Sequence, residues 1–211
     1  LHVTLSHYKR EDVRRMLVAE AKDREIAAKF GEQFGKRPDV LQYEQDVLAL
    51  AKEGATSLHA SEERWSNALQ LQPGMRRSEL DALRIGWDLV LDIDCKGWEL
   101  AKSITHLFVQ QLQKEGIAAS VKFSGNKGFH IGVAWEAFPE AMGGKKTAAE
   151  FPELPQRIAR YLIDRVENNI KVEKDPVDIG GKLFSFKELA SSTNSSEDEL
   201  RIDKCEGCGT K

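Results

Sequence analysis

The run from Asp88 to Asp94 constrains the fold of this chain more than any other segment. It reads Asp-Leu-Val-Leu-Asp-Ile-Asp, a short apolar stretch with two carboxylates near its end. Because successive side chains of a strand point to opposite faces, the run separates into an apolar face and a second face that carries the carboxylates. The first face holds Leu89, Leu91 and Ile93, and the second holds Val90, Asp92 and Asp94. The pattern predicts a buried strand that presents Asp92 and Asp94 together.

The segments that follow this strand predict an α+β fold. Apolar side chains recur at helical spacing from Leu100 to Leu112, and Gly116 suits the end of that helix. Two strands are expected over 118–123 and 129–135, joined by the hairpin signal Ser124-Gly-Asn-Lys-Gly128. Another amphipathic helix is expected from Leu154 to Ile170. The order strand, helix, strand, strand, helix matches most of a split βαβ, or RRM-like, unit.

The beginning of the chain carries a different pattern. Apolar residues recur there near helical spacing among charged ones, and they include Val13, Met16, Leu17, Ala21, Ala27 and Ala28. We therefore expect residues 1–80 to form a mainly helical N-terminal part and residues 85–175 to hold the sheet and its helices. Both parts are expected to belong to a single domain over residues 1–190, followed by a polar tail over residues 191–211.

Composition excludes several classes of protein. The chain has 211 residues, of which 41% are hydrophobic, and a net charge of −3. These values are typical of a globular protein, and they argue against one that binds nucleic acid by bulk charge attraction alone. No run approaches the ~18 apolar residues of a membrane span, and no signal peptide is visible. We therefore expect a cytoplasmic protein with no membrane contact, and the start at Leu1 suggests a piece of a longer chain.

The three cysteines do not make a disulfide framework. Cys95 is isolated, whereas Cys205 and Cys208 form a Cys-x-x-Cys pair near the end of the sequence. That spacing supplies half of the four ligands that a structural zinc site usually has. Two interpretations stay open: a zinc site that needs further ligands, or two reduced thiols.

The polar face of the expected sheet could hold a metal ion together with a nucleotide. Asp92 and Asp94 lie about 6.5–7 Å apart along a strand, so both can reach one divalent ion or bridge a pair of ions. Hard oxygen ligands favour Mg²⁺ or Mn²⁺. The same face is expected to carry Lys122, Ser124 and His130. The alternatives are a merely solvated Asp-x-Asp pair, a hydrogen-bonded histidine and an ordinary hairpin turn.

Two of these motifs together resemble the archaeo-eukaryotic primase superfamily. The first is Trp87-Asp-Leu-Val-Leu-Asp-Ile-Asp94, and the second, about thirty residues later, is Phe123-Ser-Gly-Asn-Lys-Gly-Phe-His-Ile131. The likeness is greatest to the catalytic small subunit of archaeal DNA primases. It extends over roughly residues 7 to 135, because Arg24-Glu25-Ile26 and the stretch from Ser61 to Asn67 also look like that family's N-terminal region.

The resemblance implies a primase-type catalytic core and a metal-dependent, DNA-directed nucleotidyltransferase that makes short primers. By this likeness, Asp92 and Asp94 would coordinate the catalytic Mg²⁺ or Mn²⁺. The nucleotide would be contacted by Ser124, Gly125, Lys127, Gly128 and His130. The implied partners are an NTP or dNTP, a single-stranded DNA template and a primase large subunit. Cys205 and Cys208 would correspond to the zinc knuckle that some members carry.

One part of the family pattern is missing from the sequence. The family has a third carboxylate on a later strand, followed by basic residues. Asp175 and Asp178 are stand-ins for it, but neither is followed by a basic run. The alternative is therefore a catalytically incomplete primase-like domain that binds a nucleotide or a partner. A dehalogenase-like phosphatase or a glycosyltransferase would also use an Asp-x-Asp pair, but neither accounts for the hairpin motif.

Overall fold

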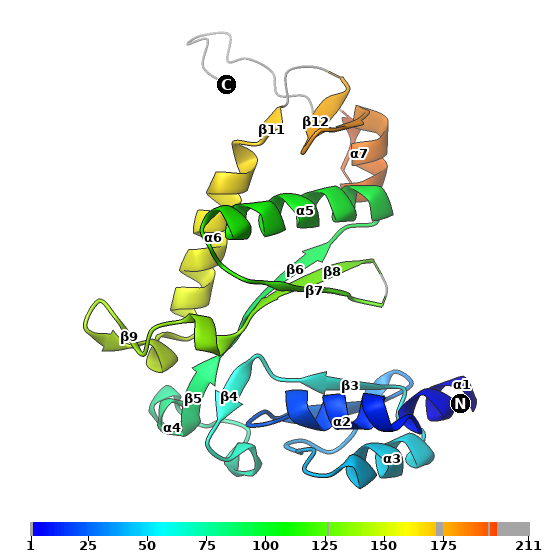
Figure 1. Cartoon of the computed structure of the whole chain (residues 1–211), viewed down its shortest axis with the longest axis vertical. Helices are drawn as coiled ribbons and strands as arrows, with labels where there is room; N and C mark the ends of the chain where they lie inside the picture. The colour runs from blue at the N-terminus through cyan, green and yellow to red at the C-terminus, as the bar shows by residue number, and fades with distance from the viewer. Residues whose placement is uncertain (1, 126, 172–174, 194, 198–211) are drawn as a thin grey trace. The chain divides into compact units, whose positions relative to one another are not determined.

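The structure, a computed structural model, describes residues 2–125, 127–171, 175–193 and 195–197 (Figure 1). Its contacts gather in two compact units. The N-terminal unit comprises Leu1–Asp88 and Phe138–Phe151, and the C-terminal unit comprises Leu89–Ala137 and Pro152–Lys211. The two units divide between Asp88 and Leu89, where the carboxylate-bearing strand begins. The single domain over residues 1–190 stays a prediction.

The N-terminal unit combines helices with three small antiparallel sheets. Its helices are α1 (His2–Tyr8), α2 (Glu11–Glu20), α3 (Glu44–Glu53) and α4 (Arg77–Leu83), with 3₁₀ turns η1 (Ala68–Gln70) and η3 (Thr147–Glu150). Its strands are β1 (Ile26–Phe30), β2 (Gln33–Phe34), β3 (Ser57–Ala60), β4 (Glu63–Trp65), β5 (Arg84–Trp87), β9 (Ala141–Met142) and β10 (Lys145–Lys146). They pair in the orders β2-β1-β3, β4-β5 and β10-β9.

The segment from Ala21 to Phe30 differs from the helix that its spacing predicted. Helix α2 ends at Glu20, Asp23 adopts a left-handed φ of 61°, and the chain continues as strand β1. Ala27 and Ala28 pair with residues of β3 instead of lying on a helix face. Consecutive small apolar residues suit a strand buried on both faces as well as a helix, so periodicity alone could not decide between them.

The C-terminal unit contains the predicted α+β pattern. Its elements are β6 (Leu89–Asp94), α5 (Trp98–Lys114), β7 (Ser120–Phe123), β8 (Gly128–Val133), η2 (Trp135–Ala137), α6 (Glu153–Glu167), β11 (Ile170–Lys171), β12 (Val177–Ile179), β13 (Lys182–Phe184) and α7 (Phe186–Thr193). One sheet has the order β6-β8-β7, and β8 runs antiparallel to both neighbours. Because α5 links two parallel strands with β8 between them, this is a split βαβ unit, as the sequence predicted.

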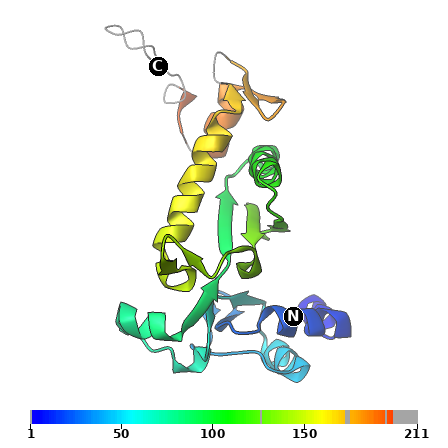
Figure 2. The same ribbon diagram turned by 60° about the vertical axis from the view of Figure 1, so that its left-hand side comes forward.

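Helix α5 covers one face of this sheet. It contacts β6 and β8 and also packs against α6, and Figure 2 shows α5 almost end-on beside the sheet. The buried side of α5 carries Leu100, Leu107 and Leu112, and Leu89 and Leu91 are buried on β6. Burying such a leucine stabilises the fold by about 1.5–3 kcal/mol, so the apolar side of β6 is strongly held toward the helix.

A second small sheet lies farther along the C-terminal unit, with the order β11-β12-β13. An ion pair between Lys182 on β13 and Glu99 ties this sheet to the start of α5. The backbone N–H of Lys96, just before α5, donates to the carbonyl of Ser192 on α7 at 2.9 Å. Across both units, none of the helices in the described part of the chain has the length and apolar character that crossing a membrane requires.

Candidate functional site

Asp92 and Asp94 lie on the face of β6 opposite the buried leucines. The observed burial alternates as the sequence predicted, with Leu89 and Leu91 buried and both carboxylates exposed. Every residue of β6 pairs with β8, and this register places Asp92 opposite His130 and Asp94 opposite Gly128. A slip of one residue would turn both carboxylates toward α5 and expose the leucines, so the hydrophobic contacts with α5 also fix the carboxylates.

His130 connects the carboxylates to the rest of the polar face. Its Nε2 atom lies 3.6 Å from Oδ1 of Asp92, and its other neighbour across the sheet is Lys122 on β7. The side chains of His130 and Asp92 are 37% and 62% exposed. An exposed pair of this kind contributes only about 0–1 kcal/mol, so both groups remain accessible to a charged ligand.

The loop between β7 and β8 is closed by Ser124. Its backbone N–H donates to the carbonyl of Gly128 at 2.9 Å, and the N–H of Gly128 donates to Oγ of Ser124 at 3.1 Å. Gly125 has a φ of +92°, which favours glycine, and Lys127 is exposed. The hydroxyl that the resemblance assigns to nucleotide contact therefore also holds the loop in shape.

Gly128 permits an unusually close approach of two strands. A Cβ atom placed on it would lie 1.7 Å from the carbonyl oxygen of Ile93, so no other residue fits without moving β8 away from β6. The sequence marked Gly128 as the end of a hairpin and, by the resemblance, as a nucleotide contact. The structure gives it a second role, because its position decides how close the loop lies to Asp94.

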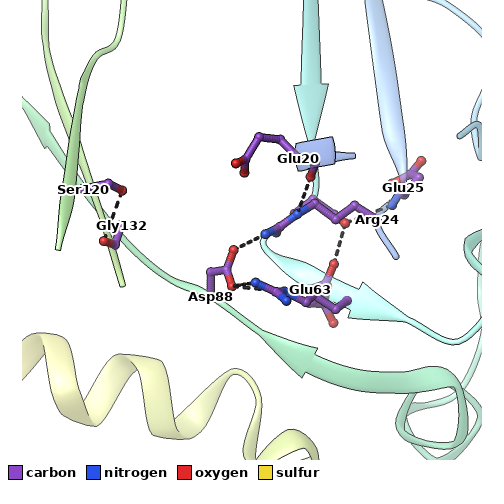
Figure 3. A network of polar contacts seen from close by, with 9 residues as sticks. Glu20, Arg24, Glu25, Glu63, Asp88, Ser120 and Gly132 are labelled. Carbon is purple, nitrogen blue, oxygen red and sulfur yellow. Dashed lines mark hydrogen bonds and ion pairs between the residues drawn. The ribbon is translucent and has the colours of Figure 1, made fainter. Parts of the chain in front are cut away.

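Small residues beside His130 leave space for a ligand on the polar face of the sheet. Gly132 lies between Val90 and Ser120 in the register, and Oγ of Ser120 donates to the carbonyl of Gly132 at 3.3 Å (Figure 3).

Cys95 follows the carboxylates, and burial raises the pKa of its thiol, while its Sγ–H points to the carbonyl of Gly97 at 3.6 Å. This thiol is therefore neutral at pH 7 and adds no charge next to Asp94.

The structure does not bring the candidate third carboxylates to Asp92 and Asp94. Asp178 lies on β12, in the other sheet of the C-terminal unit, where its Oδ1 accepts from the backbone N–H of Gly181 at 2.7 Å. Asp175 accepts from the backbone N–H of Phe186 at 3.0 Å. In the residues that the structure describes, no group of three or more His, Cys, Asp or Glu side chains is placed to hold a metal ion. Cys205 and Cys208 lie outside the described residues.

The donor set of Asp92 and Asp94 suits a cation that is shared with a ligand. Mg²⁺ usually keeps several waters and takes one or two protein carboxylates together with substrate phosphates. Two exposed carboxylates on one strand face fit that requirement, and a phosphate group would supply the missing oxygen ligands. The pair alone is a poor site for Zn²⁺, which favours nitrogen and sulfur donors.

A buried ionic network holds the residue that precedes β6. Asp88 accepts from Arg24 and from Arg64, whose Nη2 lies 2.8 Å from its Oδ1 (Figure 3). Arg24 also donates to the carbonyl oxygens of Glu20 at 2.9 Å and Ser61 at 2.8 Å. Sequence reasoning missed this network. Its only signal was that Arg24 and the stretch from Ser61 to Asn67 accompany the same primase-like motifs.

The cavities of the N-terminal unit contain none of the predicted site residues. One of about 520 Å³ is lined by residues that include Asp23, Arg24, Trp65 and Asn67. The carboxylates instead lie on an exposed sheet face, which would suit a ligand that arrives together with a cation and a nucleic acid. The chemistry of the donor groups, rather than the presence of a cavity, therefore identifies the candidate site.

No protein-family model matches the chain, and no curated protein matches it. The primase-like motifs and the geometry of the sheet are therefore the basis for any assignment of function.

Proposed function

We propose that this chain is a primase-type nucleotidyltransferase, which uses metal-bound NTPs or dNTPs to make short primers on single-stranded DNA. One observation carries the proposal: the register of β6 with β8 places Asp92 opposite His130 and Asp94 opposite Gly128, where the hairpin loop ends. Carboxylates for a cation and cationic or donor groups for phosphates thus meet on one uncovered sheet face. The primase-like sequence motifs comprise these same residues.

The proposed roles follow from the chemistry of each group. Asp92 and Asp94 would hold Mg²⁺ or Mn²⁺, which when bound stabilises charge on the phosphates and activates a hydroxyl nucleophile. His130, when protonated, can donate to a phosphate oxygen from a position that the central strand fixes. Lys127 supplies a positive charge at the loop. Phosphoryl transfer depends mainly on positioning and electrostatic stabilisation, so the site needs no covalent nucleophile.

The proposal extends to the partners that the resemblance implies. The chain carries a net charge of −3, so its own attraction for a template is weak. A primase large subunit would supply the missing affinity. Zinc binding by Cys205 and Cys208 belongs to the same proposal.

The proposal is tested by template-dependent primer synthesis with Mg²⁺ or Mn²⁺. We expect Asp92→Asn and Asp94→Asn each to reduce incorporation of labelled nucleotide by at least about a hundredfold, because a neutral amide is a poor ligand for these hard cations. Asp164→Asn is the matched control, since Asp164 is an exposed carboxylate on α6 outside the site. Full activity in either site variant would rule out the assigned role, and no product from the parent chain would contradict nucleotidyl transfer.

A second candidate is a primase-like domain that binds metal and nucleotide without transferring it. The observation that favours it is that, among the described residues, Asp92 and Asp94 have no third carboxylate beside them. A fluorescent NTP analogue distinguishes the two candidates. Metal-dependent binding that Asp92→Asn abolishes, with no product in the synthesis assay, would support this second function.

A further inference from the structure

Three aromatic rings gather where α5 begins and where the hairpin of β7 and β8 turns. The ring centroid of Trp98, the first residue of α5, lies 5.2 Å from that of Phe123 and 5.0 Å from that of Phe129. Phe123 and Phe129 face each other across the hairpin at 5.8 Å. We call these three residues the aromatic platform. Figure 1 shows the start of α5 and the tip of the hairpin on the same side of the C-terminal unit.

The platform is exposed although its rings touch one another. Trp98 is 48% exposed and Phe123 is 44% exposed. In contrast, Trp65 and Trp87 are 4% and 0% exposed. The mutual ring contacts hold these two partly exposed side chains in place, so they are preorganised for a flat ligand.

Three lysines lie close in sequence to the residues of the platform. Lys102 follows Trp98 by one helical turn, so both lie on the same side of α5. Lys96 precedes Trp98 by two residues, and Lys127 lies in the loop that joins Phe123 to Phe129. All three lysines are exposed.

The nearby carboxylates offset only part of this positive charge. Glu99, in the first turn of α5, forms ion pairs with Lys102 at 3.6 Å and with Lys182. Asp94 belongs to the opposite face of β6, because Ile93 is the β6 residue that is in register with Phe129. The surroundings of the platform therefore favour an anionic partner.

We propose that the aromatic platform binds a single-stranded nucleic acid by stacking its bases on Trp98 and Phe123. Aromatic rings beside lysines are the usual means of holding single strands, because bases stack on the rings while phosphates meet the cations. A protein partner fits less well, since protein interfaces are depleted in lysine. The inference deepens the proposed function, on which it rests for identifying the strand as the DNA template.

The test is binding of a fluorescein-labelled oligothymidylate to the full chain at low salt, in EDTA and without nucleotide. A second oligonucleotide of equal length carries abasic sites in place of the bases. We expect the parent chain to bind oligothymidylate about tenfold more tightly than the abasic strand, since stacking of one base is worth roughly that factor. Trp98→Leu keeps an apolar side chain at the start of α5 but should remove this preference for bases.

Tyr161→Leu is the matched control, because Tyr161 is 43% exposed on α6 and lies outside the platform. It should bind both strands as the parent chain does. Tryptophan fluorescence gives a second readout: oligothymidylate should quench the signal of the exposed Trp98, and Trp98→Leu should lose this quenching. Equal binding of both strands by the parent chain, an unchanged preference in Trp98→Leu, or an equal loss in Tyr161→Leu would each overturn the proposal.

The result is separate from the test of nucleotidyl transfer. EDTA removes the cation, so Asp92 and Asp94 do not take part in this binding. A preference for bases that depends on Trp98, combined with no primer synthesis, would leave the platform in place and contradict the proposed enzyme. Primer synthesis by a chain that binds both strands equally, with or without Trp98, would support the proposed enzyme and contradict the proposed role of the platform.

Discussion

The Nε2 atom of His130 lies 3.6 Å from Oδ1 of Asp92, across the central pairing of β8 with β6. This relationship joins a carboxylate that suits a cation to a side chain that suits a phosphate. The two residues are separated by more than thirty positions in the sequence. Their proximity depends on the insertion of β8 between β6 and β7, which is the feature that defines the split βαβ unit.

The first prediction concerns nucleotide affinity. Replacing His130 with glutamine removes the charge that we assign to a phosphate contact, while it keeps a polar side chain on β8. A charge-assisted hydrogen bond is worth about 1.5–3 kcal/mol, so the apparent KM for NTP should rise by at least about tenfold. Steady-state kinetics measure it, and His106→Gln, at an exposed position on α5, is the control. An unchanged KM would remove His130 from the nucleotide site.

The second prediction concerns the close approach at Gly128. Gly128→Ala should destabilise the C-terminal unit by at least about 2 kcal/mol, because its Cβ cannot share space with the carbonyl of Ile93. Gly132→Ala is the comparison, since its Cβ would meet only the hydroxyl of Ser120 at 3.0 Å. Chemical denaturation measures both variants. If they lose the same stability, strand spacing at Gly128 is not the constraint that we infer.

The third prediction concerns the ionic network around Asp88. Asp88→Asn leaves the guanidinium groups of Arg24 and Arg64 without their carboxylate in a setting where the three side chains are only 10–18% exposed. We expect Asp88→Asn to lower the free energy of unfolding by about 3 kcal/mol, which is the lower end of the range for removing one partner of a buried ion pair. Asp12→Asn, which disrupts the exposed pair with Arg10, should leave the unfolding midpoint unchanged. A similar loss in both variants would mean that burial of the network is unimportant.

The fourth prediction concerns pH. The hydrogen bond from Lys182, together with the charge of Lys102, lowers the pKa of Glu99 below its ordinary value. The stabilisation by this contact is therefore present above the unfolded pKa of Glu99 and is lost as the pH falls through the lower, folded value. Titration of Glu99 followed by NMR should show the depressed pKa, and Lys182→Gln should return it toward the ordinary glutamate value. A pKa that does not respond to Lys182→Gln would contradict the contact.

The sequence predicted those parts of the C-terminal unit that depend on local patterns. Three local patterns agree with the structure. They are the alternation of apolar and polar residues along Leu89–Asp94, the helical periodicity of α5 and the glycines of the hairpin. Each depends on one segment of the sequence only. The strand at Ile26–Phe30 was wrongly expected to be helical, because three consecutive buried residues carry no distinguishing period.

Features that depend on distant contacts could not be predicted in the same way. The pairing of Asp88 with Arg24 joins residues that are 64 positions apart. The close approach of Gly128 to the carbonyl of Ile93 results from the pairing of β8 with β6, and no local pattern in the sequence predicts it. The roles of Asp92, Asp94 and His130 stay predictions.

The most direct measurement of the central claim is paramagnetic line broadening by Mn²⁺ in the isotopically labelled chain, with a non-hydrolysable NTP present. We expect the signals of Asp92, Asp94, Gly128 and His130 to broaden together at low Mn²⁺, and Asp92→Asn to abolish the effect. Broadening that is centred elsewhere in the chain, or that persists in Asp92→Asn, would contradict a metal and nucleotide site on the uncovered face of β6 and β8.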